Sequence, residues 1–134
     1  MAKLTDIESI GEVYSAKLED AGIASVENLL QTGGDKKGRK MLAESTGVSE
    51  KQLLNWVNRA DLSRIKGVST QYADLLEMAG VDTVPELAQR KPENLQAKML
   101  QINEEKNLVR KVPTGTQVED WIKQASEMPR MVNY

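Results

Sequence analysis

The chain has 134 residues, a usual size for one domain, and its 18 Lys and Arg against 20 Asp and Glu give a formal net charge of -2. It contains no Cys and no His, which excludes disulfides, thiolate nucleophiles, imidazole general bases and nearly all zinc sites with sulfur or nitrogen ligands. We therefore expect a protein that is not an enzyme and that holds neither a metal nor another cofactor.

One segment of the chain occurs twice, because a shift of 58 positions aligns residues 7–31 with residues 65–89 without a gap. Nine of these 25 positions are identical, far more than chance gives, so we infer a duplication. The identical residues of the first copy are Ile7, Tyr14, Leu18, Glu19, Ala21, Gly22, Val26, Leu29 and Gln31. We expect two repeats, residues 1–61 and 62–134, that form one globular unit around a shared core.

Each copy begins with a turn of the pattern apolar, any residue, small, apolar, small, at Ile7–Gly11 and at Ile65–Ser69. A helix should follow and end at Gly22 or Gly80, because glycine adopts the left-handed conformation that terminates many helices. Its apolar face has Tyr, Leu and Ala at i, i+4 and i+7, which are Tyr14, Leu18 and Ala21, then Tyr72, Leu76 and Ala79. We expect both tyrosines in the core or at its edge, each against the leucine one turn on.

Local start and stop signals predict further helices. Ser25 and Thr83 are well placed to cap a second helix in each copy. Another helix is predicted from Asp35 to Thr46, ended by Gly47, and one more from Pro92 to about Lys106.

The last helix predicted in each half carries a tryptophan on its apolar face. Ser49 should cap the first of these helices and Thr116 the second, each with a Gln or Glu three residues on. The two faces match at an offset of 65 and consist of Leu53, Trp56, Val57 and Ala60, then Val118, Trp121, Ile122 and Ala125. Helical spacing favours core packing for both tryptophans. Since every predicted element is helical, the fold class is all-α.

The densest basic run follows the pair Gly33–Gly34, which predicts a flexible loop. The run contains Lys36, Lys37, Arg39 and Lys40. Such a run is more often a solvated helix start than a binding patch. We keep its four cations as weaker candidates for nucleic-acid binding.

At the two turns the sequence resembles the helix-hairpin-helix family, whose motif is apolar-x-Gly-apolar-Gly followed by a helix with a small residue and then Leu. The residues that fit are Ile7, Ile10, Gly11, Ser15 and Leu18 in the first copy and Ile65, Gly67, Val68, Ala73 and Leu76 in the second. Over most of its length the chain also resembles an uncharacterised bacterial family of tandem hairpins, a domain of unknown function. The resemblance implies two tandem hairpins with additional helices in one compact unit.

In proteins similar at the hairpin level, such as repair polymerases, glycosylases, ligases and flap endonucleases, the hairpin holds the DNA backbone without reading its sequence. The resemblance therefore implies weak contact with DNA or RNA phosphates and no particular reaction. Backbone N–H groups would point at a phosphate oxygen, and glycine would let the phosphate approach. Both copies depart from the motif, since Ser9 replaces the first glycine of one and Ser69 the second glycine of the other.

Charge separates the two copies as phosphate sites. The first 61 residues carry 8 basic and 10 acidic side chains and the others 10 and 10, so net charge is -2 in one part and 0 in the other. Three carboxylates flank the first turn and two cations the second, namely Asp6, Glu8 and Glu12, then Arg64 and Lys66. We therefore predict the site in the second copy. Its residues are Arg64, Lys66, Gly67, Val68, Ser69 and Thr70, with Ser9 and Gly11 as weaker candidates.

The alternative is a protein-interaction or scaffold module whose hairpins are purely structural, because domains that grip phosphates are usually clearly basic. An enzyme would need a carboxylate metal site, and the adjacent pairs Glu104–Glu105 and Glu119–Asp120 point to different faces of a helix. The sequence has no run of about 18 apolar residues and no apolar stretch typical of a signal peptide. We expect a cytoplasmic protein without membrane contact.

Overall fold

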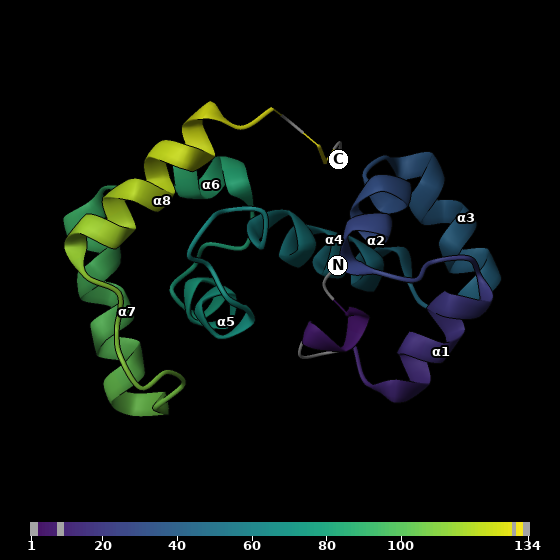
Figure 1. The fold of residues 1–134 in the computed structure, drawn as a ribbon, viewed down its shortest axis with the longest axis horizontal. Helices are drawn as coiled ribbons and strands as arrows, with labels where there is room; N and C mark the ends of the chain where they lie inside the picture. The colour runs from purple at the N-terminus through teal and green to yellow at the C-terminus, as the bar shows by residue number, and fades with distance from the viewer. Residues whose placement is uncertain (1–2, 8–9, 130, 133–134) are drawn as a thin grey trace. The chain divides into compact units, whose positions relative to one another are not determined.

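A computed structural model describes residues 3–7, 10–129 and 131–132 of the chain (Figure 1). Over these residues the fold is all-α, as predicted, and no strand is present. The elements are η1 (Leu4–Asp6), α1 (Glu12–Asp20), α2 (Val26–Gly33), α3 (Lys36–Thr46), α4 (Glu50–Leu62), α5 (Thr70–Met78), α6 (Val84–Ala88), α7 (Pro92–Lys106) and α8 (Gly115–Glu127). The sequence therefore specifies the fold class correctly.

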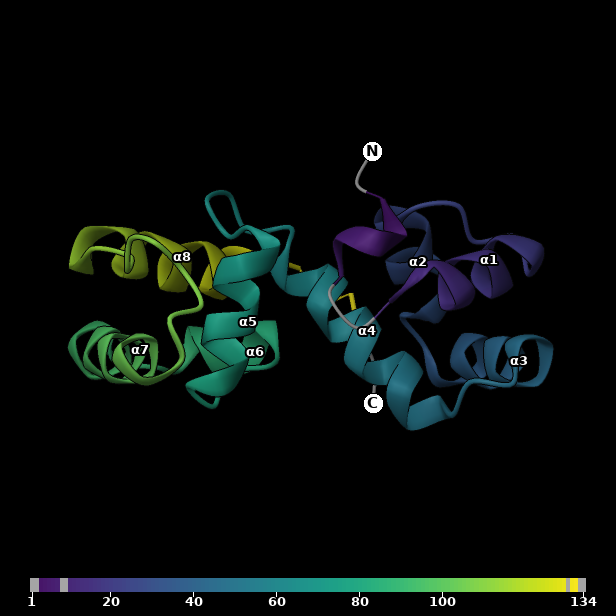
Figure 2. The same cartoon turned by 90° about the horizontal axis from the view of Figure 1, so that it is seen from below.

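The chain divides into two compact units, residues 1–61 with 130–134, and residues 62–129. In the first unit α3 packs against α1 and α2. In the second, α8 packs against α6 and α7, and α5 packs against α7 (Figures 1 and 2). Where the sequence predicted one shared core, the buried apolar side chains instead form two clusters, one for each unit. Each repeat has enough amphipathic helices to bury its own apolar faces.

The duplicated segment has the same backbone in both units. Helices α1 and α5 each have 9 residues and lead into a left-handed glycine, Gly22 at φ 91° and Gly80 at φ 94°. The next residue donates its N–H to the carbonyl five residues back over 2.8 Å, in Ile23 to Leu18 and in Val81 to Leu76. This is the Schellman closure that glycine permits. The repeat therefore extends from sequence to main-chain hydrogen bonding.

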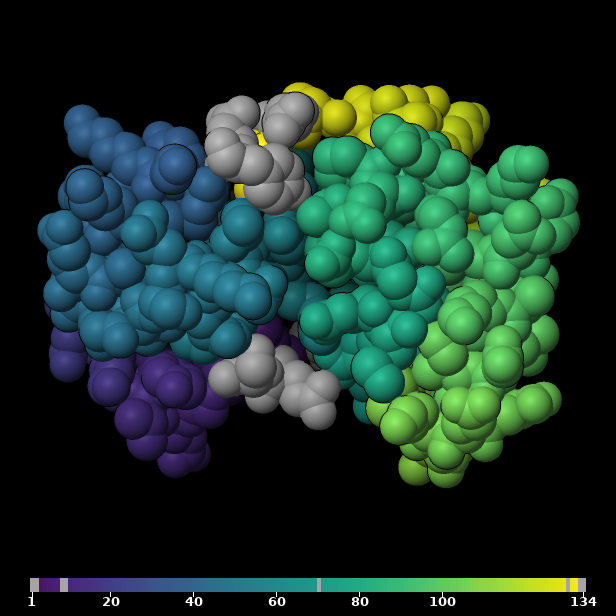
Figure 3. Space-filling view, turned by 180° about the vertical axis from the view of Figure 1, so that it is seen from behind, coloured from purple at the N-terminus to yellow at the C-terminus, as the bar shows by residue number. Residues whose placement is uncertain are grey.

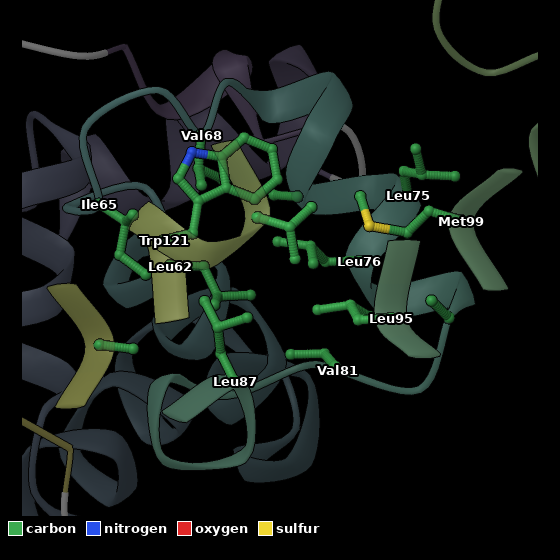
Figure 4. Packing of buried hydrophobic residues seen from close by; sticks show 14 of the residues in the cluster. Leu62, Ile65, Val68, Leu75, Leu76, Val81, Leu87, Leu95, Met99 and Trp121 are labelled. Carbon is green, nitrogen blue, oxygen red and sulfur yellow. The ribbon is translucent and has the colours of Figure 1, made fainter. Parts of the chain in front are cut away.

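Both tryptophans lie in the cores, as predicted. Trp56 and Trp121 are each 1% exposed. Tyr14 packs edge-on against Trp56, with ring centroids 5.3 Å apart, and Tyr72 packs against Trp121 at 5.4 Å. Tyr72 thus lies at the core edge, whereas Tyr14 is 41% exposed. The ring partner of each tyrosine is the tryptophan of the last helix in its unit, where the sequence predicted a leucine. Figure 4 shows Trp121 among the leucines and valines of the second cluster.

Local capping signals place most helix ends correctly. The Asp35 side chain accepts from the N–H of Gly38 at 2.7 Å, and α3 ends at left-handed Gly47, φ 77°. Helix α8 starts earlier than predicted, because Thr114 caps it in place of Thr116. Thr114 Oγ1 accepts from the N–H of Gln117, and Gln117 Oε1 accepts from the N–H of Thr114, so two exposed donors are satisfied at once.

The glycine pair after α2 is buried, and the prediction of a flexible loop there is wrong. Gly33 ends α2 and Gly34 is its C-cap. A Cβ on Gly33 would lie 2.7 Å from Val57 Cγ2, and one on Gly34 would lie 2.6 Å from the carbonyl oxygen of Met131. The glycines therefore serve close packing, and the second admits the segment that carries Val132, 3% exposed, into the first core.

Replacing Gly34 with Ala should destabilise the first unit by about 1–3 kcal/mol, the usual cost of overpacking, because two carbonyl oxygens lie within 3.0 Å of the new Cβ. Urea denaturation followed by tryptophan fluorescence measures this change. Gly115→Ala is the matched control, since its nearest neighbour is the end of the Gln96 side chain at 3.4 Å. Equal stability of the two variants would contradict the close contact at Gly34.

Candidate functional site

The predicted site of the second unit is the turn of residues 64–70, between α4 and α5. Val68 is 6% exposed and anchors the turn in the core, whereas Lys66, Gly67 and Ser69 are exposed. The side chain of Gln124 holds the turn from α8. Its Oε1 accepts from the Lys66 N–H at 2.9 Å, and its Nε2 donates to the Lys66 carbonyl at 3.1 Å. The peptide of Lys66 is therefore fixed and already hydrogen-bonded.

Gly67 is required by the fold. It adopts φ +96°, a conformation that L side chains rarely take, and a Cβ there would lie 2.8 Å from Nε1 of Trp121. The hairpin motif predicts that this glycine admits a phosphate. In the structure, the lack of a side chain at Gly67 lets the turn lie close to the indole of Trp121 on α8.

Ser69 is the N-cap of α5. Its Oγ accepts from the N–H of Tyr72 at 3.3 Å, so the serine that replaces the second motif glycine caps the helix. The first N–H groups of any helix lack intrahelical partners and carry a partial positive charge. The first turn of α5 contains no acidic residue, so no carboxylate of that turn opposes an approaching anion. The backbone of Thr70 begins this helix.

The equivalent turn of the first unit has the opposite electrostatics. Gly11 is the N-cap of α1 without a side-chain cap, and Glu12 occupies the first helical turn. Ser9 and Glu8 lie outside the described residues. A carboxylate at this helix start repels an anion, which agrees with the prediction that this copy is the weaker candidate.

The basic run at the start of α3 separates into two kinds of residue. Lys36, Lys37 and Lys40 are exposed. Arg39 is 4% exposed, and its Nη1 donates to the Gly33 carbonyl at 2.9 Å. The arginine therefore joins α3 to the end of α2, and its burial removes it from a surface phosphate contact.

The structure brings a loop from far along the sequence to the start of α5. The segment Asn107–Lys111, between α7 and α8, lines an open pocket together with Ser69, Gln71 and Tyr72. Sequence reasoning missed Arg110 and Lys111 here. Their only local signal is an adjacent pair of cations in a short stretch between a helix end and Pro113. Figure 3 shows one face of this unit, on which the atoms of α5 and α6 adjoin those of α7.

A family model with the description "Domain of unknown function (DUF4332)" matches residues 8–128. The chain belongs to this family. The DUF4332 match covers the second turn, all of the first except Ile7, and all eight α-helices of the described part. It confirms the expectation of a domain-of-unknown-function family. No curated protein and no solved structure matches the chain.

The described part of the DUF4332 chain contains neither a cluster of metal-binding side chains nor a membrane-spanning helix. Among residues 3–7, 10–129 and 131–132, no group of three or more His, Cys, Asp or Glu side chains could hold a metal ion. None of the helices in that part is long and apolar enough to cross a membrane.

One carboxyl group of the second unit titrates abnormally. A hydrogen bond with the side chain of Asp82 raises the pKa of Glu86 above its ordinary value of 4.5, and burial and the charge of Asp82 add to the effect. Thr83 and Arg90 act in the opposite direction. Because the folded pKa is raised, the contribution to stability is present at low pH and is lost as pH rises through the folded pKa of Glu86.

Asp82→Asn should lower the pKa of Glu86 towards its ordinary value, because the main cause of the shift is the Asp82 carboxyl. An NMR pH titration of the Glu86 side chain measures the change. Glu104→Gln on α7 is the control and should leave the Glu86 pKa where it is. A Glu86 pKa that stays raised in the Asp82→Asn variant would show that burial alone is the cause.

Proposed function

We propose that the second unit binds the phosphate backbone of nucleic acids without reading base sequence. The observation that carries the proposal is the turn of residues 64–70 at the start of α5, which Val68 anchors in the core and Gln124 holds by two hydrogen bonds. There Lys66 is exposed and the first helical turn has no carboxylate. A phosphate at such a helix start meets backbone N–H groups, a partial positive charge and the nearby lysine.

The proposed function requires that each unit be a helix-hairpin-helix. Each unit has a turn closed by a hydrogen bond three residues back, Ile10 to Ile7 in the first and Val68 to Ile65 in the second. In each, a helix, a left-handed glycine and a second capped helix follow in the same order. The hairpin motif of proteins that bind the DNA backbone predicts this order of elements. The repeated order therefore supports the assignment of two helix-hairpin-helix units.

The proposed contact is independent of base sequence. Backbone N–H groups and a lysine can reach phosphate oxygens, which are alike at every nucleotide, and base edges are not needed. With a net charge of -2 for the whole chain, binding should be weak and confined to this surface. The proposal describes a binding module of the cytoplasm and not an enzyme.

A protein-interaction module is the second candidate. The first unit leaves large apolar side chains exposed, with Val13 on α1 at 70% and Met41 on α3 at 58%. Apolar side chains exposed in this way can form part of a protein interface. Such an interface would depend little on salt, whereas a phosphate contact weakens steeply as salt rises.

Lys66→Ala should weaken binding to labelled duplex and single-stranded DNA about equally for all sequences, and it should lower the slope of log affinity against log salt by about 0.9 on duplex. Fluorescence anisotropy from low to moderate salt measures both quantities. Lys51→Ala, an exposed lysine in the first turn of α4, makes the same change in net charge and should leave the slope unchanged.

If Lys66→Ala and Lys51→Ala changed the affinity and the salt slope equally, the proposed site would be wrong. Binding no tighter than about millimolar at low salt would leave the protein-interaction hypothesis in place. A substitution at Gly67 is a poor test, because it disturbs the contact with Trp121 whether or not DNA binds.

A further inference from the structure

An open pocket of about 460 Å³ adjoins the proposed phosphate site in the second unit. One wall consists of Ser69, Gln71 and Tyr72, and the other is the segment Asn107–Lys111. Its volume falls within the range of about 300–1,000 Å³ that small-molecule sites occupy. Ser69 belongs both to the pocket and to the turn, so the two adjoin each other.

The pocket lining is positively charged. Arg110 and Lys111 both line it and both are exposed. All eight lining residues are described by the structure, and none of them is acidic. The pocket therefore offers two cations to an anion without an opposing carboxylate in its wall, although the chain as a whole is acidic.

The backbone that presents these cations is held at two points. The Tyr72 hydroxyl donates to the Lys111 carbonyl at 3.0 Å. Asn103 holds the other end, because its Nδ2 donates to the Val109 carbonyl and its Oδ1 accepts from the Val109 N–H, each at 3.0 Å. Binding an anion here would therefore cost little ordering of the loop.

The rest of the lining combines three polar side chains, Ser69, Gln71 and Asn107, with apolar and aromatic ones. Leu108 and Val109 contribute apolar surface, and Tyr72 contributes its ring and hydroxyl. The ring of Tyr72 packs on Trp121 with centroids 5.4 Å apart, so it is a fixed wall. A pocket that joins a flat apolar wall to a pair of cations is complementary to a nucleotide, which has an apolar base face and a charged phosphate.

We infer that this pocket binds one unpaired nucleotide of a strand whose backbone contacts the turn of residues 64–70, and this inference rests on the proposed function. A paired base is stacked inside a duplex and cannot enter a pocket without being unpaired, which costs a few kcal/mol. The protein should therefore bind single strands, or the ends and gaps of duplexes, more tightly than intact duplex.

The double variant Arg110→Ala with Lys111→Ala tests the pocket. On a single-stranded 12-nucleotide DNA, the affinity should fall about tenfold and the salt slope by about 1.4, as expected for the loss of two phosphate contacts to a single strand. Binding to a closed hairpin duplex should change much less. The matched control is Lys91→Ala with Lys98→Ala, two exposed lysines of the same unit, which should have little effect on either ligand.

A variant that keeps the charge separates the pocket from a general electrostatic effect. Leu108→Ala should weaken single-strand binding several-fold and leave the salt slope unchanged, because it removes apolar wall and no cation. Leu108 is partly packed against the core, so thermal unfolding must first show that the variant is folded. A folded Leu108→Ala protein with unaltered affinity would overturn the pocket.

The two proposals fail in different ways. Loss of binding in Lys66→Ala but not in the Arg110–Lys111 variant overturns the pocket and keeps the turn. Loss only in the Arg110–Lys111 variant supports the pocket and overturns the turn as its phosphate contact. No binding of either DNA by the unaltered protein overturns both.

Discussion

Each unit depends on one contact, in which a buried tryptophan of its last helix packs against a tyrosine of an earlier helix. In the second unit Trp121 is 1% exposed, supports the ring of Tyr72, and comes so close to Gly67 that a Cβ there would lie 2.8 Å from the indole nitrogen. A buried aromatic of this size fixes the spacing of the elements around it. The turn and the start of α5 are thereby placed by a residue more than fifty positions later in the sequence.

The two units share apolar core residues but differ in surface charge. Matched positions in the core retain apolar residues, as in Leu18 and Leu76, both at 0% exposure. At the first residue of the helix, Glu12 of α1, which is exposed, corresponds to Thr70 of α5. Surface substitutions usually change stability by less than about 0.5 kcal/mol. Charge can therefore differ between the copies at little cost in stability, and here Glu12 puts a carboxylate at one helix start while Thr70 puts none at the other.

Features set by nearby residues were predictable, and features set by distant ones were not. The start and end of α3 follow from Asp35 and Gly47, whose effects reach only a few residues. The role of Gly34 depends on Met131, and the place of Arg110 beside α5 depends on packing between α5 and α7. The spacing of apolar residues along the sequence does not predict such long-range contacts. The turn as a candidate site was predictable from its motif and flanking charge, whereas its neighbouring cations were not.

The bonding of Gln124 decides which part of the turn can face a ligand. Its Nε2 donates both to the Lys66 carbonyl and to Asp120 Oδ2, at 3.1 and 2.8 Å, so a carboxylate fixes which end of the amide carries the donors. The other end then accepts the Lys66 N–H, which is no longer available to a phosphate. An anion at this turn must therefore be held by the N–H groups at the start of α5 and by the lysine side chain. Because Asp120 also adds a negative charge close to the turn, it reduces the attraction for an anion, in line with the weak binding that we propose.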